Sequence, residues 1–380
     1  MGSNQTVQGR LNQPGASSHK NRNRILTAVT LVIFVVFLFL ADQGIILDSY
    51  GVRIIRLCGV YTIAALSMTL INGLTGQFSL GQAGFMAIGA YTTSLLIIPP
   101  EVKEQMYYVT PIQGWVRDMQ APFLAAILIG GLLAALIAFL IGFPVLRLRG
   151  DYLAIATLGF SEIIRVIITN VGSVTNSSIG IKSIPDTANI WWTTIAAALC
   201  ITLVYRLMKT SYGRAFKSIR DDEVAAEAMG ISLFKHKMLS FVISGFLAGL
   251  SGGLLASVVG VINPLYFRFT LAYEILLIVV LGGQGSITGT LVSACLITAG
   301  KEWLRFLDSG FSIGPITIPE ISGLRMLVFS ALLMVVILFY RRGLFGSNEF
   351  SWDGLFRLIQ RTGARCKRLI RRGEKGGAAK

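Results

Sequence analysis

Long apolar runs separated by short polar connections dominate the pattern along this chain. A helix needs about 20 mostly apolar residues to cross the hydrocarbon core of a membrane. Runs of this kind, or close to it, cover residues 25–41, 54–72, 84–98, 122–146, 153–170, 190–208, 238–262, 271–299 and 324–340. The pattern predicts an all-α polytopic membrane protein with about eight to ten transmembrane segments.

Lysine and arginine gather in some connections and avoid others, which predicts the orientation of the segments. Residues 206–237 hold seven Lys/Arg, and residues 341–380 hold eleven against three acids. Residues 99–121 hold two against three acids, and residues 172–189 hold one charge of each sign. By the positive-inside rule, the first two segments face the cytoplasm and the other two face outside.

The same charge pattern divides the chain into three parts. We expect a basic cytoplasmic tail at residues 1–24, a transmembrane domain at 25–342 with a cytoplasmic loop at 209–237, and a basic cytoplasmic tail at 343–380. Both termini are then cytoplasmic. In the second tail, an apolar face with helical spacing predicts an interfacial helix, formed by Trp352, Leu355, Phe356 and Ile359. The alternative is a disordered tail whose charge only fixes orientation.

Two glycine-rich interruptions stand out within the apolar runs. Segment 271–299 must enter the membrane and return if its neighbours keep their predicted orientation, and residues 282–286 (Gly-Gly-Gln-Gly-Ser), the second break, divide it. The first break, residues 73–84, interrupts the chain between two earlier runs. The short patterns at 76–80 and 283–287 can be aligned, which leaves an internal repeat possible. Broken helices of this kind mark transport sites in many carriers.

The breaks supply the candidate residues of a translocation path. Broken helices free backbone groups that protein or water must satisfy. Small and polar side chains suit this role, and the candidates are Gly76, Gln77, Ser79, Gln82, Gly283, Gln284 and Ser286. Plain helix packing by small residues is the alternative.

Ionisable residues within the runs are few, and each is costly in lipid. Glu162 and Arg165 are spaced to share a helix face and to form an intramembrane ion pair. The pair is either a polar point on a translocation path or a structural contact, and we favour the second. Glu274 is either an interfacial anchor or a site residue, and Arg53 and Arg56 are expected to snorkel toward the interface.

Composition and charge exclude several classes of protein. The chain is 53% hydrophobic and only 14% charged, with a mean hydropathy of +0.68. These values exclude a disordered chain and an ordinary soluble enzyme. The net charge of +15 would suggest nucleic-acid binding in a soluble protein, but here it lies in loops and tails beside apolar runs. We therefore expect membrane lipid, and no nucleic acid, as a partner.

No pattern indicates catalysis, a cofactor or a metal site. The four cysteines have no metal-ligand spacing, and His19 and His236 both lie outside the apolar runs. An intramembrane enzyme is therefore disfavoured. No phosphate-binding loop of the G-x-x-x-x-G-K-[ST] type occurs, so energy must come from a partner or an ion gradient.

The basic loop contains a predicted short helix. Asp221 is the expected N-cap, with Asp222 and Glu223 in the first turn, and Gly230 suits the position after the last turn. Such a short helix is marginal alone, so we expect it either to dock onto a partner or to serve as a solvated connector.

Several blocks resemble one family. Residues Glu223–Gly230 resemble the E-A-A-x-x-x-G coupling segment of ABC importer permeases, in a looser form with Met229 in place of a small residue. Residues 73–91 are similar to a stretch shared by branched-chain amino-acid permeases, and 280–286 to another. Residues 147–158 resemble the LivM-type member. The resemblance covers about residues 53–343, without the basic tails.

The resemblance implies the permease subunit of a multi-subunit ATP-driven importer in the inner membrane. Its partners would be two ATPase subunits that bind ATP, a second homologous permease of the LivH type, and an external substrate-binding protein. The residues implied in ATPase coupling are Arg220, Asp221, Asp222, Glu223, Glu227 and Gly230. Branched-chain amino acids are the implied cargo, with urea or amides carried by close relatives. The alternative is an ion-coupled secondary transporter that works without an ATPase.

Overall fold

The computed structural model describes residues 15–108, 110–148, 150–307, 311–313, 316–318, 323–339, 343, 344 and 346. The chain divides into two compact units, one formed by Met1–Ser49 with Phe350–Lys380 and the other by Tyr50–Glu349. In the first unit, helix α1 (Gly15–Asp42) begins inside the predicted N-terminal tail. Residues 1–14 of that tail and the predicted interfacial helix near Trp352 lie outside the described residues.

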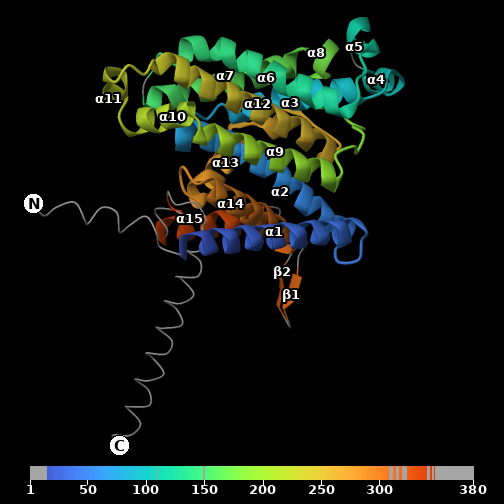
Figure 1. Ribbon diagram of the computed structural model, residues 1–380. Coiled ribbons are helices and arrows are strands. Elements are labelled where there is room, and N and C mark those ends of the chain that lie inside the picture. Colours follow the sequence, from blue (N-terminus) through green and yellow to red (C-terminus); the bar gives the residue numbers. More distant parts are fainter. Residues whose placement is uncertain are drawn as a thin grey trace, which may run out of the picture. The chain divides into compact units, whose positions relative to one another are not determined.

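The second unit is built almost entirely of helices (Figure 1). Its longer helices are α2 (Ser49–Met68), continued by the π-helical turn η2 (Thr69–Leu74), then α3 (Gln82–Ile97), α6 (Phe123–Val145), α7 (Asp151–Asn170), α9 (Ile190–Lys209), α10 (Ser211–Asp221), α12 (Leu233–Val259), α13 (Phe269–Gly282), α14 (Ile287–Trp303) and α15 (Leu324–Phe339). Its short elements are α4 (Pro100–Met106), α5 (Gly114–Asp118), α8 (Gly172–Thr175), η3 (Ser177–Ile179), α11 (Glu223–Ala228), η4 (Pro264–Phe267) and η5 (Leu304–Leu307). A small antiparallel hairpin, β1 (Phe311–Ile313) with β2 (Ile316–Ile318), was not expected from the sequence.

The helices confirm an all-α polytopic membrane protein. Within the described residues, six helices are long and apolar enough to cross a membrane, namely α1, α2 with η2, α6, α7, α9 and α12. The count rises to seven if α3 and α4, which bend by 117° at their junction, form one span. The remaining predicted segments form the shorter helices α13, α14 and α15.

Close contact between α3, α6 and α12 forms the centre of the second unit. A Cβ added to Gly89 of α3 would lie 2.0 Å from the carbonyl oxygen of Gly249 in α12, and one added to Gly252 would lie 2.0 Å from that of Met86. Gly245 likewise faces Ala138 of α6. Small residues let helix backbones approach in this way in membranes, where the hydrophobic effect does not drive helix association.

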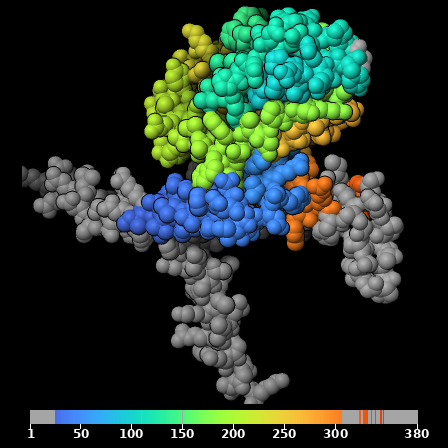
Figure 2. All heavy atoms as spheres, turned by 90° about the vertical axis from the view of Figure 1, so that its right-hand side faces the viewer, coloured from blue at the N-terminus to red at the C-terminus, as the bar shows by residue number. Residues whose placement is uncertain are grey.

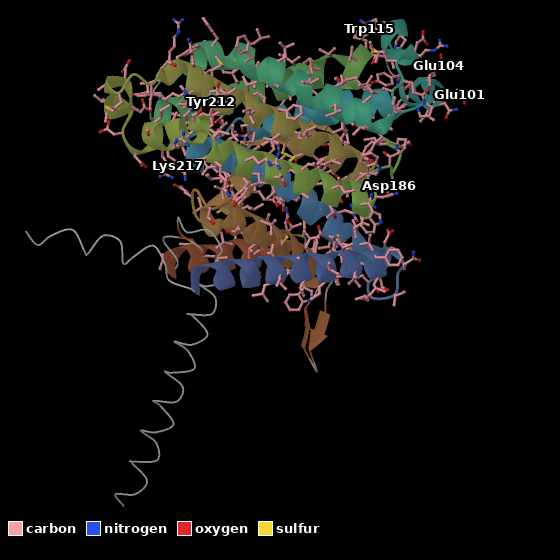
Figure 3. The ribbon with its side chains drawn as sticks, in the orientation of Figure 1. Glu101, Glu104, Trp115, Asp186, Tyr212 and Lys217 are labelled. Atoms are coloured by element: carbon pink, nitrogen blue, oxygen red, sulfur yellow. The ribbon has the colours of Figure 1, made fainter. Side chains whose placement is uncertain are left out.

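The two ends of the second unit differ in their elements and charge. Helices α10 and α11 lie at one end, and α4, α5 and α8 lie at the other (Figure 1); we call these the α10 end and the α4 end. Figure 2 faces the α4 end, where α4 and α5 appear in cyan. Glu101, Glu104 and Asp186 lie at the α4 end, whereas Lys217 lies at the α10 end (Figure 3).

Candidate functional site

The first break is an extended, mostly buried segment. Helix α2 ends in the π-helical turn η2, and the chain then runs without helix through residues 75–81 until α3 begins at Gln82. Turns of this π type are frequent at functional sites. Polar side chains take up the freed backbone groups: Asn72 Oδ1 accepts from the Ser79 amide at 3.1 Å, and Thr157 Oγ1 accepts from the Leu80 amide at 3.0 Å.

The second break is a glycine turn between two antiparallel helices. Gly283 and Gly285 have φ of +103° and +97°, in the region that favours glycine. Ser286 then caps α14, because its hydroxyl accepts from the Gly289 amide at 3.0 Å. Since Ser293 of α14 donates to the carbonyl of Ile278 in α13, the two helices run back along each other. Entry of segment 271–299 into the membrane and its return stay a prediction.

The two breaks meet at the α10 end. A Cβ added to Gly73 would lie 2.6 Å from the backbone nitrogen of Gly285, so the two backbones touch. Next to this contact, the buried hydroxyls of Thr69 and Thr290 share a 2.9 Å hydrogen bond. The sequence predicted both breaks but gave no indication that they lie together.

The side chain of Arg220 lies at this junction of the breaks. Its Nη1 donates to the carbonyl of Gly73 at 3.4 Å, and a Cβ added to Gly285 would lie 3.3 Å from the same nitrogen. The guanidinium also binds Asp221 Oδ1, through Nε at 3.0 Å and Nη2 at 2.9 Å. Gly76 has φ of +76°, and a Cβ there would come within 2.9 Å of Arg220 Cγ.

The predicted short helix of the basic loop is α11, with corrected boundaries. The expectation that Asp221 caps it is wrong, because Asp221 ends α10. Asp222 is the N-cap instead, and its Oδ1 accepts from the amides of Val224 and Ala225 at 2.8 and 3.0 Å. The extended backbone of Asp222 lets the chain turn between two helices. Gly230 has φ of +82° beyond the end of α11, as its predicted position requires.

One face of these two helices is buried and the other is exposed. Phe216 and Ile219 of α10 are buried in the second unit, whereas the side chains of Val224 and Met229 in and after α11 are 75% and 83% exposed. Glu227 is exposed as well. Glu223 Oε1 accepts from Lys237 Nζ of α12 at 2.6 Å, which ties α11 to the membrane helices. Lys237 also reaches the first break, since its carbonyl accepts from Gln77 Nε2 at 3.4 Å.

The candidate path residues have two kinds of surroundings. Gln77, Ser79, Gln82, Gly283 and Ser286 are buried in the protein, whereas Gly76 and Gln284 are exposed at the α10 end. Gln82 Nε2 donates to Ser244 Oγ at 3.1 Å. Within the described part of the chain, the second polar atoms of Gln77 and Gln82, their Oε1 atoms, have no hydrogen-bond partner. Their role in a translocation path stays a prediction.

Glu162 and Arg165 form an ion pair within α7, with Arg165 Nε 2.6 Å from Glu162 Oε2. The other oxygen of Glu162 accepts from the backbone amide of Phe269 at 3.1 Å, at the start of α13. The bond from Phe269 to Glu162 joins the start of α13 to α7. These contacts support a structural role for the ion pair over a role in translocation.

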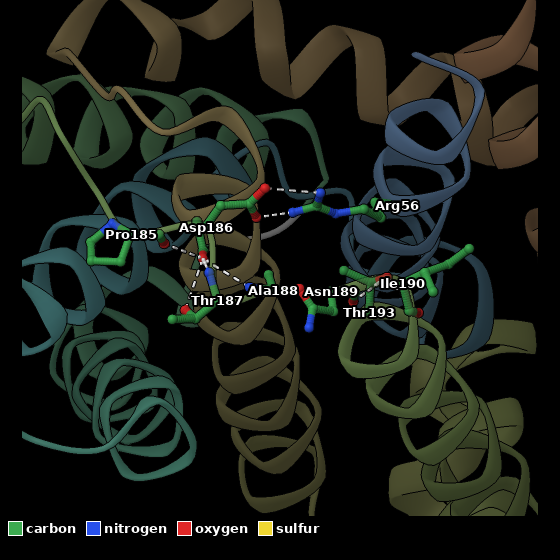
Figure 4. A network of polar contacts seen from close by, with 9 residues as sticks. Arg56, Pro185, Asp186, Thr187, Ala188, Asn189, Ile190 and Thr193 are labelled. Carbon is green, nitrogen blue, oxygen red and sulfur yellow. Dashed lines mark hydrogen bonds and ion pairs between the residues drawn. The ribbon is translucent and has the colours of Figure 1, made fainter. Parts of the chain in front are cut away.

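Sequence reasoning missed an ion pair at the α4 end. Arg56 of α2 does not snorkel as expected but binds Asp186 through Nη1 and Nη2. Beside this pair, Ser257 of α12 accepts from the amides of Thr187 and Ala188 at 3.1 Å (Figure 4). Asp186 lies 130 residues from Arg56 in a loop of low charge. No local pattern in the sequence indicates such a distant partner.

Comparisons with known proteins agree on one family. The family model for the permease component of branched-chain amino acid transport systems matches residues 50–338. The chain is 32% identical over 326 residues to the LivM high-affinity branched-chain amino acid transport system permease proteins of Salmonella typhimurium and Escherichia coli, covering 77% of this chain and 71% of each relative.

A more distant permease is related too. The chain is 25% identical over 313 residues to the LivH permease protein of Salmonella typhimurium, covering 78% of this chain and 94% of that one. No solved structure matches the chain significantly.

Proposed function

This chain belongs to the family of permease components of branched-chain amino acid transport systems, and from that premise we propose that it is the membrane permease subunit of an ATP-driven importer. Separate ATPase subunits would drive it through α10 and α11. The cargo would be branched-chain amino acids moving into the cytoplasm, with urea or short amides as the alternative cargo.

The exposed face of α11 is the observation that carries this proposal. Two large apolar side chains, Val224 and Met229, are exposed beside the acidic groups of Asp222 and Glu227. A helix of six residues is too short to be stable alone, so it gains stability by docking. An ATPase subunit that covered both apolar side chains would supply that contact.

Two polar connections would carry a movement of α11 into the membrane helices. Arg220, beside the start of α11, binds the backbone where the two breaks meet. Glu223 holds Lys237 of α12, and the backbone of Lys237 binds Gln77 of the first break. Through these contacts, a displacement of α11 would change the surroundings of the first break. The unpaired Oε1 atoms of Gln77 and Gln82 support a second arrangement of this break, since buried unpaired polar atoms cost free energy.

Charge at the two ends supports the proposed orientation. The α10 end contains Lys217 and the other basic residues of 206–237, whereas Glu101, Glu104 and Asp186 lie at the α4 end (Figure 3). By the positive-inside rule, the α10 end faces the cytoplasm, where ATPase subunits would dock. We further propose two ATPase subunits, a LivH-type second permease and an external binding protein at the α4 end.

Co-purification of the subunits tests the proposal. The tagged chain is co-expressed with the ATPase and second permease, and the recovered ATPase is compared with that of the double variant Val224→Ser, Met229→Ser. We expect a loss of about tenfold or more, because burial of an aliphatic side chain contributes about 1.5–3 kcal/mol. The control is Tyr108→Ser, which removes a side chain that is 76% exposed near the α4 end.

Two results would contradict the proposal. If the double variant recovers as much ATPase as the unmodified chain does, α11 is not the docking site of the ATPase. Leucine uptake by vesicles that contain only this chain, driven by an ion gradient without ATP, would favour the ion-coupled carrier instead.

A further inference from the structure

A cavity of about 1120 Å³ lies between helices α2, α12, α13 and α14 of the second unit. Its lining comes from the first half of α2, the start of α13, the ends of α12 and α14, the segment 261–267 and Arg305 of η5. The start of α2 and the end of α12 lie toward the α4 end (Figure 1). This end is opposite the junction of the breaks. None of the residues predicted for the translocation path lines the cavity.

Charged groups of both signs line this cavity, and most of them have partners. Lys301 Nζ lies 2.7 Å from Glu274 Oε1 and fastens α14 to α13. Tyr50 donates its hydroxyl to Glu302 Oε2 at 2.8 Å, while the guanidinium carbon of Arg305 lies 5.8 Å from the centre of the Tyr50 ring.

Arg53 differs from these groups. It is exposed and lines the cavity, and in the described part of the chain its guanidinium has neither an ion pair nor a hydrogen-bond partner. Glu302 has no ion-pair partner there either. Arg53 and Tyr50 are three residues apart on α2, so they are neighbours on one helix face. Tyr50 binds the carboxylate of Glu302, so this carboxylate lies beside the first turn of α2, which also contains Arg53.

Aliphatic side chains form a large part of the remaining wall, beside the hydroxyls of Thr270 and Thr298. Leu57 continues the face of Arg53 on α2, and Leu255 and Val259 face it from α12. Leu265 and Leu271 add aliphatic surface from the segment that leads into α13. A cation, an anion and an aliphatic surface therefore all line this cavity.

We propose that this cavity binds zwitterionic amino acids with aliphatic side chains. Arg53 takes the carboxylate, since the planar guanidinium binds carboxylates through two parallel hydrogen bonds. Glu302 takes the ammonium, and the aliphatic wall takes the side chain. This inference rests on the proposed function and narrows its cargo, because urea and short amides have no net charges for Arg53 and Glu302 to bind.

Ligand analogues and matched variants test the two charged groups separately. The full chain is purified with its second permease subunit in lipid nanodiscs, and binding of radiolabelled L-leucine is competed with L-leucinamide, which lacks the carboxylate, and 4-methylpentanoate, which lacks the ammonium. We expect leucine to bind about tenfold or more tightly than either analogue, because each leaves a charged group of the site unpaired.

The variants should change this discrimination in opposite ways. Arg53→Gln should weaken leucine binding about tenfold and leave leucinamide binding unchanged. Glu302→Gln, which keeps an acceptor for Tyr50, should weaken leucine binding and leave 4-methylpentanoate binding unchanged. Arg268→Gln is the control, because Arg268 is an exposed cation near the same end that does not line the cavity.

Three results would overturn the proposal: no leucine binding by the wild-type complex, wild-type binding of leucine by Arg53→Gln, or an equal loss of leucine and leucinamide binding in that variant. ATP-driven leucine uptake by the same complex separates this proposal from the proposed function. If uptake does not depend on Arg53, the proposed binding site is wrong and the proposed importer function is not affected. If leucine binding depends on Arg53 but ATP does not drive uptake, the proposed importer function is wrong and the proposed binding site is not affected.

Discussion

Arg220 Nη1 donates to the backbone carbonyl of Gly73 at 3.4 Å, although 147 residues separate the two in the chain. Arg220 lies one residue before the end of α10, and Gly73 lies in the π-helical turn that ends α2. The contact therefore joins the exposed loop helices to the first break, at the place where Gly285 of the second break also touches Gly73.

Replacing Arg220 should separate ATPase docking from transport. In Arg220→Ala, the exposed face of α11 is unchanged, but the bond to Gly73 is lost. We expect the ATPase to co-purify normally, while substrate-stimulated ATP hydrolysis falls about tenfold, as loss of a charged hydrogen bond of about 1.5 kcal/mol implies. Lys217→Ala is the control, since Lys217 is an exposed cation on the same helix. Full stimulation in Arg220→Ala would show that the contact is not needed for coupling.

A methyl group at the junction of the breaks should force the backbones apart. In Gly73→Ala, the new Cβ would lie 2.6 Å from the Gly285 nitrogen, and neither atom is at the end of a flexible side chain. Overpacking of this kind costs about 1–3 kcal/mol, so we expect a lower thermal midpoint and slower transport. Gly159→Ala in α7 is the matched control, because nothing lies within 4 Å of its added Cβ. Equal midpoints for the two variants would contradict the close contact.

The local sequence pattern predicted the elements of this fold well, because membrane spans and their interruptions depend on the types of consecutive residues. The apolar runs became helices, and the glycines of 282–286 became the turn between α13 and α14. Gly230 has the left-handed backbone that its position after α11 predicted. Each of these features depends on the chemistry of a few neighbouring residues.

Contacts between distant segments could not be predicted in the same way. Nothing near Gly73 in the sequence indicates that Gly285 lies against it, and nothing near Arg56 indicates that it binds Asp186 instead of snorkelling toward the interface. The N-cap was misplaced by one residue for a related reason. Asp221 and Asp222 are both good caps, and the preceding helix α10, which was not predicted, includes Asp221.

The ion pair between Glu223 and Lys237 should contribute to coupling. Its Nζ–Oε1 distance is 2.6 Å, and the Lys237 side chain is only 9% exposed. Removing Glu223 leaves that buried ammonium without its partner, so Glu223→Gln should lower ATPase stimulation, and Lys237→Met with Glu223→Gln should recover part of the loss. The measurement is a double-mutant cycle on stimulated hydrolysis. Additive effects of the two substitutions would mean that the pair does not act as a unit.

Gly230 offers a test in which backbone conformation is separated from side-chain volume. Its φ is +82°, and nothing lies within 4 Å of an added Cβ, so a substitution there meets strain but no clash. Gly230→Ala should cost about 1 kcal/mol and weaken ATPase recovery about fivefold, because alanine rarely adopts this conformation.

Gly230→Asn should recover most of the binding despite its larger side chain, since asparagine tolerates the left-handed region. Gly114→Ala is the control, because that glycine also has open space but an ordinary φ. If asparagine weakened ATPase recovery as much as alanine does, side-chain volume at the docking surface, and not the backbone at the end of α11, would be the property that matters.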